Sequence, residues 1–156
     1  MASTYDLIII GSGLAGLTAG LFAGRAKLET AILESEAFGG SIINAGLVEN
    51  FPGFPNGVSG ATLVANLMKQ VMQYGVEFKR TKTIGIELRN CLKLVNTIEA
   101  GYFAKAVIIA AGLDRKSWEF LAKRNIGGMV YFIALCMMAT VFLIVKWLLL
   151  GEVTEG

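Results

Sequence analysis

The sequence contains no histidine, only two prolines and only two cysteines among its 156 residues. The lack of histidine excludes a histidine-ligated haem, a histidine metal site and a histidine general base. The two cysteines, Cys91 and Cys136, are far apart, so the sequence holds no CxxC pair for a dithiol redox centre or a zinc knuckle. We therefore expect neither a metal ion nor haem in this protein.

Charged residues are also few and nearly balanced, with 14 Lys and Arg against 12 Asp and Glu and a net charge of +2. The basic residues do not gather in one run, so we expect no nucleic-acid partner. Hydrophobic residues make up 54% of the chain, and the excess lies near its C-terminal end. The length is sufficient for one domain with its own core.

The most informative motif is a glycine turn directly after the apolar run Tyr5–Ile10, made of Gly11, Ser12, Gly13, Leu14, Ala15 and Gly16. In the dinucleotide-binding fingerprint, the first glycine permits the tight turn out of the strand. The second lets the backbone approach a pyrophosphate, and the third lets the following helix pack closely on the sheet. Here these roles fall to Gly11, Gly13 and Gly16.

The residues after the turn complete the pattern of a nucleotide-binding βαβ unit. A helix is expected over Leu14–Ala26, and its N-terminus would offer free N–H groups to phosphates. A second strand, Glu29–Glu34, ends in an acid that is placed to accept a hydrogen bond from a ribose hydroxyl. The sequence therefore predicts a dinucleotide site. The alternative is that the uncharged stretch Leu7–Gly24 is a signal peptide or a membrane helix, but five glycines and the lack of a preceding basic residue disfavour it.

Further elements follow up to residue 112. Ser59 has the character of a helix N-cap, and Gly75 stops the helix that Ser59 begins. Short alternating runs then predict a small β-meander, and the last buried strand is Ala104–Ala111. The four runs of the meander are Val76–Lys79, Ile84–Leu88, Cys91–Val95 and Thr97–Glu99.

The C-terminal part has a different composition. No charge occurs from Asn125 to Val145, and about twenty apolar residues reach roughly 30 Å as a helix, the thickness of the hydrocarbon core of a bilayer. Lys146 can snorkel, and Trp147 suits the membrane interface. The alternative is a buried core helix, which normally keeps one polar face. We expect a nucleotide-binding domain over 1–115, a charged linker over 116–125, one transmembrane helix over 126–150 and a tail over 151–156.

The charges that flank this hydrophobic segment predict its orientation. Arg115, Lys116, Lys123 and Arg124 precede it, whereas Glu152 and Glu155 follow it. Positive flanks stay on the cytoplasmic side. We therefore expect a single-pass membrane protein whose N-terminal domain faces the cytoplasm. The lipid bilayer would be one partner, and other subunits of a membrane complex could contact the helix.

Three further motifs give a family resemblance: Phe38-Gly39-Gly40-Ser41, the segment Val48–Pro55 with Glu49-Asn50-Phe51-Pro52-Gly53, and Ala106–Gly112. In this order, residues 4–115 resemble the FAD-binding part of the thioredoxin reductase-like flavoproteins. The resemblance implies an α/β, Rossmann-like, three-layer domain with a small β-meander, and FAD as the cofactor.

The resemblance also implies roles for individual residues. Residues 11–16 would hold the FAD pyrophosphate, and Glu34 would hold the adenosine ribose. Gly40, Ser41 and Asn50 would approach the flavin. Thr83 and Ile84 would lie near the adenine. Ala111 and Gly112 would lie beside the dinucleotide.

Several departures from the family pattern limit what the resemblance implies. Ser41 stands where the family usually has glutamine, and Ala111 stands where it has threonine. The NADPH-binding domain with its CxxC, and the returning Gly-Asp segment of the FAD domain, have no counterpart in these 156 residues. We therefore expect that the chain is not a self-sufficient thioredoxin reductase, and no catalytic residue can be named.

Two functions are compatible with these observations. The first is a membrane-anchored FAD-binding subunit of a larger electron-transfer complex, in which the flavin does the redox chemistry. The second is a non-catalytic accessory subunit of a membrane complex, with a degenerate thioredoxin reductase-like fold. The intact glycine turn and Glu34 favour the first function, and the missing closing segment favours the second.

Overall fold

The computed structural model describes residues 4–89, 91–112 and 130–132 of the chain. The chain order is β1 (Thr4–Ile10), α1 (Leu14–Arg25), β2 (Thr30–Glu34), the 3-10 helix η1 (Gly40–Asn44), α2 (Gly60–Met72), β3 (Glu77–Arg80), β4 (Thr83–Arg89), β5 (Leu92–Thr97), β6 (Gly101–Ile109) and β7 (Val130–Phe132).

A parallel sheet forms the centre of the domain, with the order β3-β2-β1-β6 and with β7 beside β6. In β1, Ile9 lies between Ile32 of β2 and Ile108 of β6. Strands β1 and β2 and the second half of β6 are buried on both faces, which explains their nearly continuous apolar sequences. All four strands β1, β2, β6 and β3 are parallel, so their carboxyl ends lie at one edge of the sheet.

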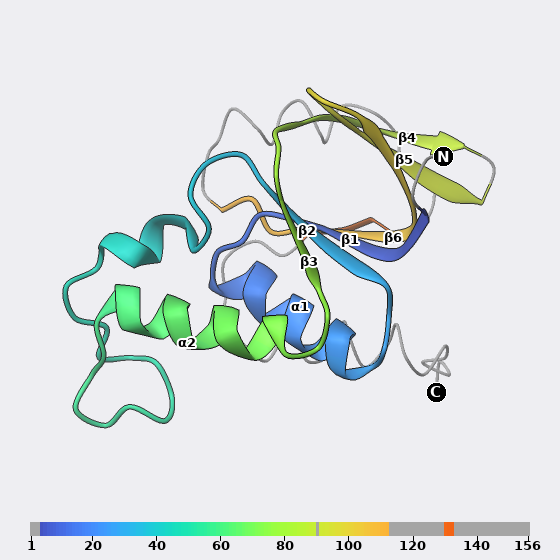
Figure 1. The fold of residues 1–156 in the computed structure, drawn as a ribbon. Helices are drawn as coiled ribbons and strands as arrows, with labels where there is room; N and C mark the ends of the chain where they lie inside the picture. Colours follow the sequence, from blue (N-terminus) through green and yellow to red (C-terminus); the bar gives the residue numbers. More distant parts are fainter. Residues whose placement is uncertain (1–3, 90, 113–129, 133–156) are drawn as a thin grey trace, which may run out of the picture.

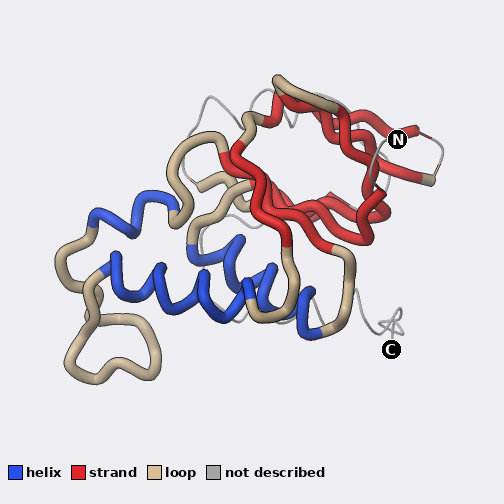
Figure 2. Tube along the Cα trace, viewed as in Figure 1, coloured by secondary structure: helices blue, strands red, loops and turns tan. Residues whose placement is uncertain are grey.

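Strand β6 also belongs to an antiparallel meander, because its first half pairs with β5, and β5 pairs with β4. Figures 1 and 2 show the consequence, since β4 and β5 curl over one face of the parallel sheet while α1 and α2 cover the other. The domain therefore has three layers: helices, parallel sheet and meander. This confirms the α/β, Rossmann-like, three-layer fold expected from the sequence.

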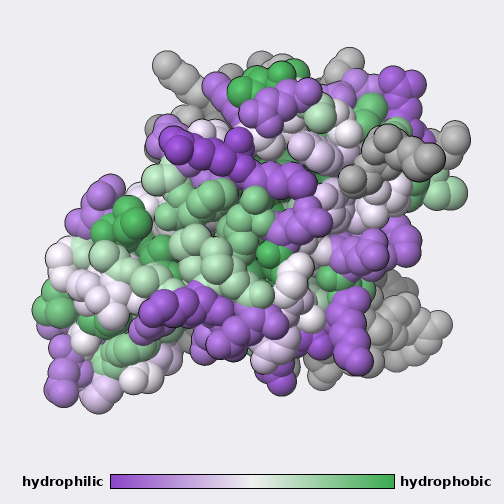
Figure 3. Space-filling model, viewed as in Figure 1, coloured by the Kyte–Doolittle hydropathy of each residue, from purple (hydrophilic) through white to green (hydrophobic). Residues whose placement is uncertain are grey.

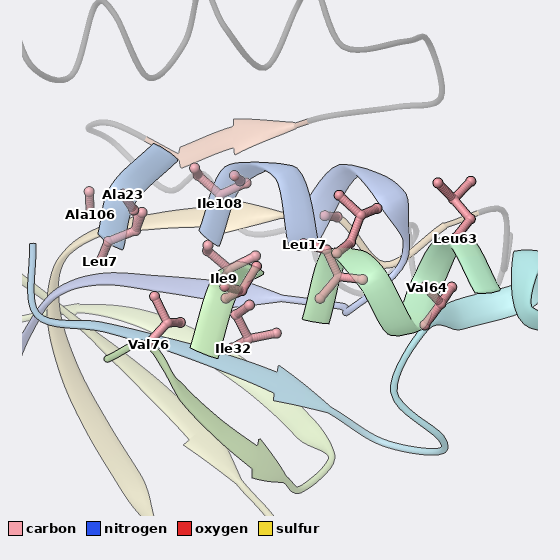
Figure 4. Close-up of a cluster of buried hydrophobic side chains, with 14 of the residues drawn as sticks. Leu7, Ile9, Leu17, Ala23, Ile32, Leu63, Val64, Val76, Ala106 and Ile108 are labelled. Carbon is pink, nitrogen blue, oxygen red and sulfur yellow. The ribbon is translucent and has the colours of Figure 1, made fainter. Parts of the chain in front are cut away.

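Each pair of layers encloses its own hydrophobic core. Between the helices and the sheet lie side chains such as Leu7, Ile9, Leu17 and Ile108 (Figure 4). Between the sheet and the meander lies a second cluster, which includes Ile8. Alternate residues of β1 thus enter opposite cores, as the two-residue period of a strand requires. Figure 3 shows apolar side chains between hydrophilic bands, over the region where α2 approaches β3.

Glycines in α1 and a serine before α2 explain how these two helices are placed. In α1, a Cβ atom at Gly20 would lie 2.7 Å from Cδ1 of Ile32, and one at Gly24 would lie 2.7 Å from Cβ of Tyr74. Glycines four residues apart therefore give α1 one flat face toward the sheet and the turn after α2. At the start of α2, the Ser59 hydroxyl accepts a hydrogen bond from the Thr62 N–H at 3.1 Å, which confirms the expected N-cap.

The prediction of four strands in the meander is wrong for two of the four runs. Val76–Lys79 largely corresponds to β3, which pairs in parallel with β2 and so belongs to the central sheet. Thr97–Glu99 is not a separate strand, because the Thr97 hydroxyl accepts hydrogen bonds from the N–H groups of Glu99 and Ala100 and closes a turn there. The alternative of one membrane helix over Leu7–Gly24 is also wrong, since a strand, a turn and α1 occupy that stretch.

Most of the C-terminal predictions fall outside the described residues. These include the linker over 116–125, the tail over 151–156 and most of the helix predicted over 126–150. Val130–Phe132, within that predicted helix, instead form β7 in parallel with β6. Across the described part of the chain, no helix has both the length and the apolar character that crossing a membrane demands.

Candidate functional site

The candidate site lies at the edge of the sheet where β1, β2 and β6 end. The glycine turn leaves β1 at this edge and leads directly into α1. Gly11 has φ +101°, and a Cβ atom there would overlap the carbonyl oxygen of Ala110. The N–H of Ala110 donates to the Ile10 carbonyl oxygen at 2.7 Å, so the segment after β6 stays against the glycine turn. Ala111 is therefore next to the turn, and Gly112 follows it; both are exposed.

Gly16 is a glycine because of the fold itself. A Cβ atom at this position would overlap the carbonyl oxygen of Gly11. The first turn of α1 thus lies directly on the backbone of the glycine turn, which is the close packing expected from the third glycine of the motif.

Gly13 differs, because no atom lies within 4 Å of a Cβ atom placed on it. Its backbone is extended, with φ −66° and ψ −174°, a conformation open to any residue. Nothing in the fold of the described residues therefore requires glycine here. The open space beside Gly13, called the Gly13 cradle below, has Gly40 at its border, since a Cβ atom on Gly40 would lie 3.0 Å from Cα of Gly13.

Glu34 is joined to the glycine turn by hydrogen bonds. Its Oε2 accepts from the Ser12 N–H at 2.9 Å and from the Ser12 hydroxyl at 2.7 Å. Its Oε1 accepts from the N–H of Glu36 at 3.2 Å and from the Ser35 hydroxyl at 3.4 Å. The Ser12 hydroxyl in turn accepts from the N–H of Gly39 at 3.0 Å. The glycine turn, the end of β2 and the turn before η1 thus meet at Ser12.

The electrostatic consequence is an ionised carboxylate at the end of β2. Burial alone would raise the pKa of Glu34, but the hydrogen bonds from the hydroxyl and N–H of Ser12, with those from the backbone of Glu36 and Ser35, outweigh it. The net result is a pKa below the ordinary value. At neutral pH the half-buried Glu34 therefore carries a negative charge and only accepts hydrogen bonds.

Residues 5–134 match the family described as pyridine nucleotide-disulphide oxidoreductase. The chain belongs to this family. Over 125 residues it is 40% identical to the bifunctional thioredoxin reductase/thioredoxin of Mycobacterium leprae (strain TN), covering 80% of this chain and 27% of that protein. It is 38% identical over 112 residues to the thioredoxin reductase of Peptoclostridium acidaminophilum, covering 72% of this chain and 36% of that protein.

A solved structure gives the same relationship. The thioredoxin reductase from Streptococcus pyogenes MGAS5005 superposes with a TM-score of 0.68 and 40% identity, over 72% of this chain and 36% of that chain. This pyridine nucleotide-disulphide oxidoreductase domain is thus the thioredoxin reductase-like portion that the sequence motifs indicated. The chain spans only about a third of the length of these relatives.

The family match ends at residue 134, so it extends beyond residue 115, where the sequence analysis placed the end of the nucleotide domain. It also includes β7 (Val130–Phe132), which lies beside β6. The matched residues thus include the beginning of the apolar segment.

The remaining predicted site residues lie on two other segments. Ser41 is exposed on η1, and Asn50 is exposed in the loop that the paired Val48 and Val58 close. Within the described residues, no hydrogen bond joins either side chain to the glycine turn, so their roles stay predictions. Thr83 and the 47% exposed Ile84 begin β4.

Two threonine hydroxyls close to this region have no partner in the described structure. The Oγ1 atoms of Thr81 and Thr83 are both buried and without a hydrogen bond. The N–H of Thr81 donates to the carbonyl oxygen of Glu34 at 2.8 Å, which places the start of this segment beside the end of β2. A buried hydroxyl without a partner is uncommon in folded proteins.

Sequence reasoning missed the connecting role of Ser12 and Gly39. It assigned Glu34 to a ribose alone, whereas the structure shows that Ser12 already holds this carboxylate. The only signal in the sequence was a small polar residue between two glycines, which is too common to identify such a contact. In the described part of the chain, no three side chains of the Cys, Asp and Glu types gather as a metal site would need.

Proposed function

We propose that this chain binds FAD through the Gly13 cradle. The observation that carries the proposal is Gly13 itself, which has an extended backbone and open space where a side chain would stand. A glycine that the fold does not need is explained by a ligand that comes too close to the backbone for any side chain. The family membership supplies the class of ligand.

The residues at the site fit a dinucleotide. Gly13 is the N-cap of α1, no side chain caps that helix end, and the first turn holds no acid. The N–H groups of Leu14, Ala15 and Gly16 can therefore receive the pyrophosphate. When bound, FAD supplies an isoalloxazine ring that accepts and donates electrons.

The other predicted residues would line the two ends of the cofactor. Glu34 would accept hydrogen bonds from the adenosine ribose, with Thr83 and Ile84 toward the adenine. On the flavin side, the proposed residues are Gly40, Ser41, Asn50, Ala111 and Gly112. The hydrogen bond from the Thr81 N–H to the Glu34 carbonyl oxygen supports the adenine side, because it places the segment that leads to Thr83 beside the end of β2.

Glu34 favours FAD over NADP. A 2′-phosphate on the ribose would carry negative charge toward a carboxylate whose pKa is already lowered. FAD has a free ribose hydroxyl at this place, and a carboxylate is a good acceptor for it. We therefore propose a cofactor without a 2′-phosphate.

The purified full-length chain is expected to take up FAD and to show the visible absorbance bands of oxidised flavin after gel filtration. The measurement is the ratio of flavin to protein after incubation with FAD, with NADP in a parallel sample. If the folded chain retains no flavin, FAD binding is wrong, and the accessory role in a membrane complex becomes the function to test.

We propose further that the apolar segment anchors the chain in a membrane, where it assembles with other subunits of an electron-transfer complex. Because β7 ends at Phe132, the spanning helix would begin after it and cover 133–150, which is 150 − 132 = 18 residues. At about 1.5 Å per residue this is about 27 Å, within the usual range for a spanning helix. Under the positive-inside rule, the FAD-binding domain would face the cytoplasm.

The anchored chain is expected to remain in the membrane pellet after an alkaline carbonate wash. As a matched comparison, Val141→Arg with Phe142→Arg places two charges at the middle of the segment, each costing about 3 kcal/mol in a bilayer centre. This variant is expected in the supernatant. Release of the wild-type chain by carbonate would refute the anchor and leave FAD binding unaffected.

A further inference from the structure

We propose that Ser12 is a positioning residue, whose hydroxyl fixes the Glu34 carboxylate and the Gly39–Gly40 turn around the Gly13 cradle before any dinucleotide enters. The inference rests on the proposed FAD site and extends it. The family resemblance places Ser12 at the pyrophosphate, but its side chain is buried and its N–H donates to Glu34, so Ser12 would act through these neighbours.

The first support is that Ser12 is fully buried and its hydroxyl both donates and accepts a hydrogen bond. Its exposed fraction is 0%. The hydroxyl donates to Oε2 of Glu34 at 2.7 Å and accepts from the Gly39 N–H at 3.0 Å. A hydroxyl is the smallest side-chain group that can donate and accept at once, so alanine would lose both contacts.

The second support is that the two oxygens of the Glu34 carboxylate accept hydrogen bonds of unequal length. Oε2 holds two donors from Ser12, at 2.7 and 2.9 Å, whereas the donors on Oε1 lie farther away, at 3.2 and 3.4 Å. An ionised carboxylate offers about four acceptor positions in total, so these four donors fill them. A ribose hydroxyl must therefore displace one of the donors, and the longer contacts on Oε1 are the weaker ones. Oε1 is thus the oxygen that would receive the ribose hydroxyl.

The third support is the turn at Gly39, whose N–H donates to the Ser12 hydroxyl. Gly39 has φ +117°, and a Cβ atom there would lie 2.6 Å from Cγ1 of Val64. The hydrogen bond from its N–H to Ser12 holds this turn, and Gly40, which follows, lies against Gly13. One hydroxyl therefore contacts both the Glu34 carboxylate and the Gly39–Gly40 turn, whose second residue borders the Gly13 cradle.

The test compares Ser12→Ala with Ser59→Ala in the full-length chain. Both variants lose one serine hydroxyl that accepts a backbone N–H, and both are expected to lose stability. The measurement is the titration of the Glu34 carboxyl by carbon-13 NMR without FAD, with its signal identified by its loss in Glu34→Gln. In Ser12→Ala the pKa of Glu34 should rise toward or above its ordinary value of 4.5, whereas in Ser59→Ala it should stay that of the wild type.

The second measurement is the affinity for FAD. We expect Ser12→Ala and Glu34→Gln each to weaken binding by at least tenfold, and Ser59→Ala to leave it within twofold. Since Ser12 acts in part through Glu34, the double variant should lose less than the product of the two single losses. If Ser12→Ala fails to fold, Ser12→Cys provides the same comparison, because a thiol is a much weaker donor.

A Glu34 titration that is identical in Ser12→Ala and in the wild type would overturn the inference, and so would single losses that simply multiply. Failure of this inference can be told apart from failure of the proposed function. If the wild-type chain binds no FAD, FAD binding is wrong, and the ligand-free titration then decides the role of Ser12 by itself.

Discussion

Replacing Gly13 with valine is expected to weaken FAD binding strongly while leaving the domain folded. Apart from its chain neighbours, no atom lies within 4 Å of a Cβ atom on Gly13, so the new side chain would extend from there into the Gly13 cradle. The extended backbone at Gly13 suits a β-branched residue. The loss of a glycine N-cap costs at most about 1 kcal/mol. Affinity for FAD should fall by at least tenfold, about 1.4 kcal/mol, as measured by flavin retention and equilibrium titration.

The matched control is Gly46→Val in the loop after η1. A Cβ atom at Gly46 also meets nothing within 4 Å and its backbone has no positive φ, but neither Gly46 nor its chain neighbours have a proposed role in binding the cofactor. This variant is expected to bind FAD as the wild type does. Equal FAD affinity in the wild type and in a folded Gly13→Val variant would show that the cofactor binds elsewhere or not at all.

Replacing Gly16 with alanine is expected to have the opposite outcome, a large loss of folding stability. The added methyl group would overlap the carbonyl oxygen of Gly11, and neither α1 nor the turn can move without breaking contacts in the core. Overpacking at a rigid backbone site costs about 3 kcal/mol. For a domain of this size, that loss lowers the melting temperature by more than about 10 °C.

Thermal unfolding followed by circular dichroism, without added FAD, is the measurement for Gly16→Ala. Gly46→Ala is the control, because a Cβ atom at Gly46 meets nothing within 4 Å and its backbone has no positive φ. Its melting temperature should equal or slightly exceed that of the wild type. Equal melting temperatures for Gly16→Ala and the wild type would mean that α1 does not pack on the glycine turn as described.

The elements that the sequence predicted correctly are those fixed by local patterns. The run Tyr5–Ile10, the glycine turn and the acid at Glu34 lie within about thirty residues, and their order alone determines the βαβ unit. Ser59 capped its helix as predicted because a cap is a contact between residues three positions apart. The thioredoxin reductase-like motifs then gave the family.

The errors arose where pairing between distant residues decides the structure. The sequence of β3, Glu-Phe-Lys-Arg, has one apolar residue among polar ones, which suits an edge strand of either the parallel part of the sheet or the meander. Only its pairing with β2 assigns it to the parallel part. The contact between Ser12 and Glu34 depends on the register that places Ile10 beside Leu33. No local pattern carries that register, so this part of the site could not be predicted.

The pairing of β1 with β6 has a consequence for how the protein is made. Ile8 lies beside Val107, so the central strand finds one of its two neighbours 107 − 8 = 99 residues later in the chain. Contacts at such separations form slowly, because the entropy of closing the intervening loop is lost before they stabilise anything. During synthesis on the ribosome, one edge of β1 therefore stays unpaired until β6 has been made. Under the proposed membrane anchor, the apolar run follows soon after β6, so folding of the domain and delivery to a membrane would compete in time during synthesis.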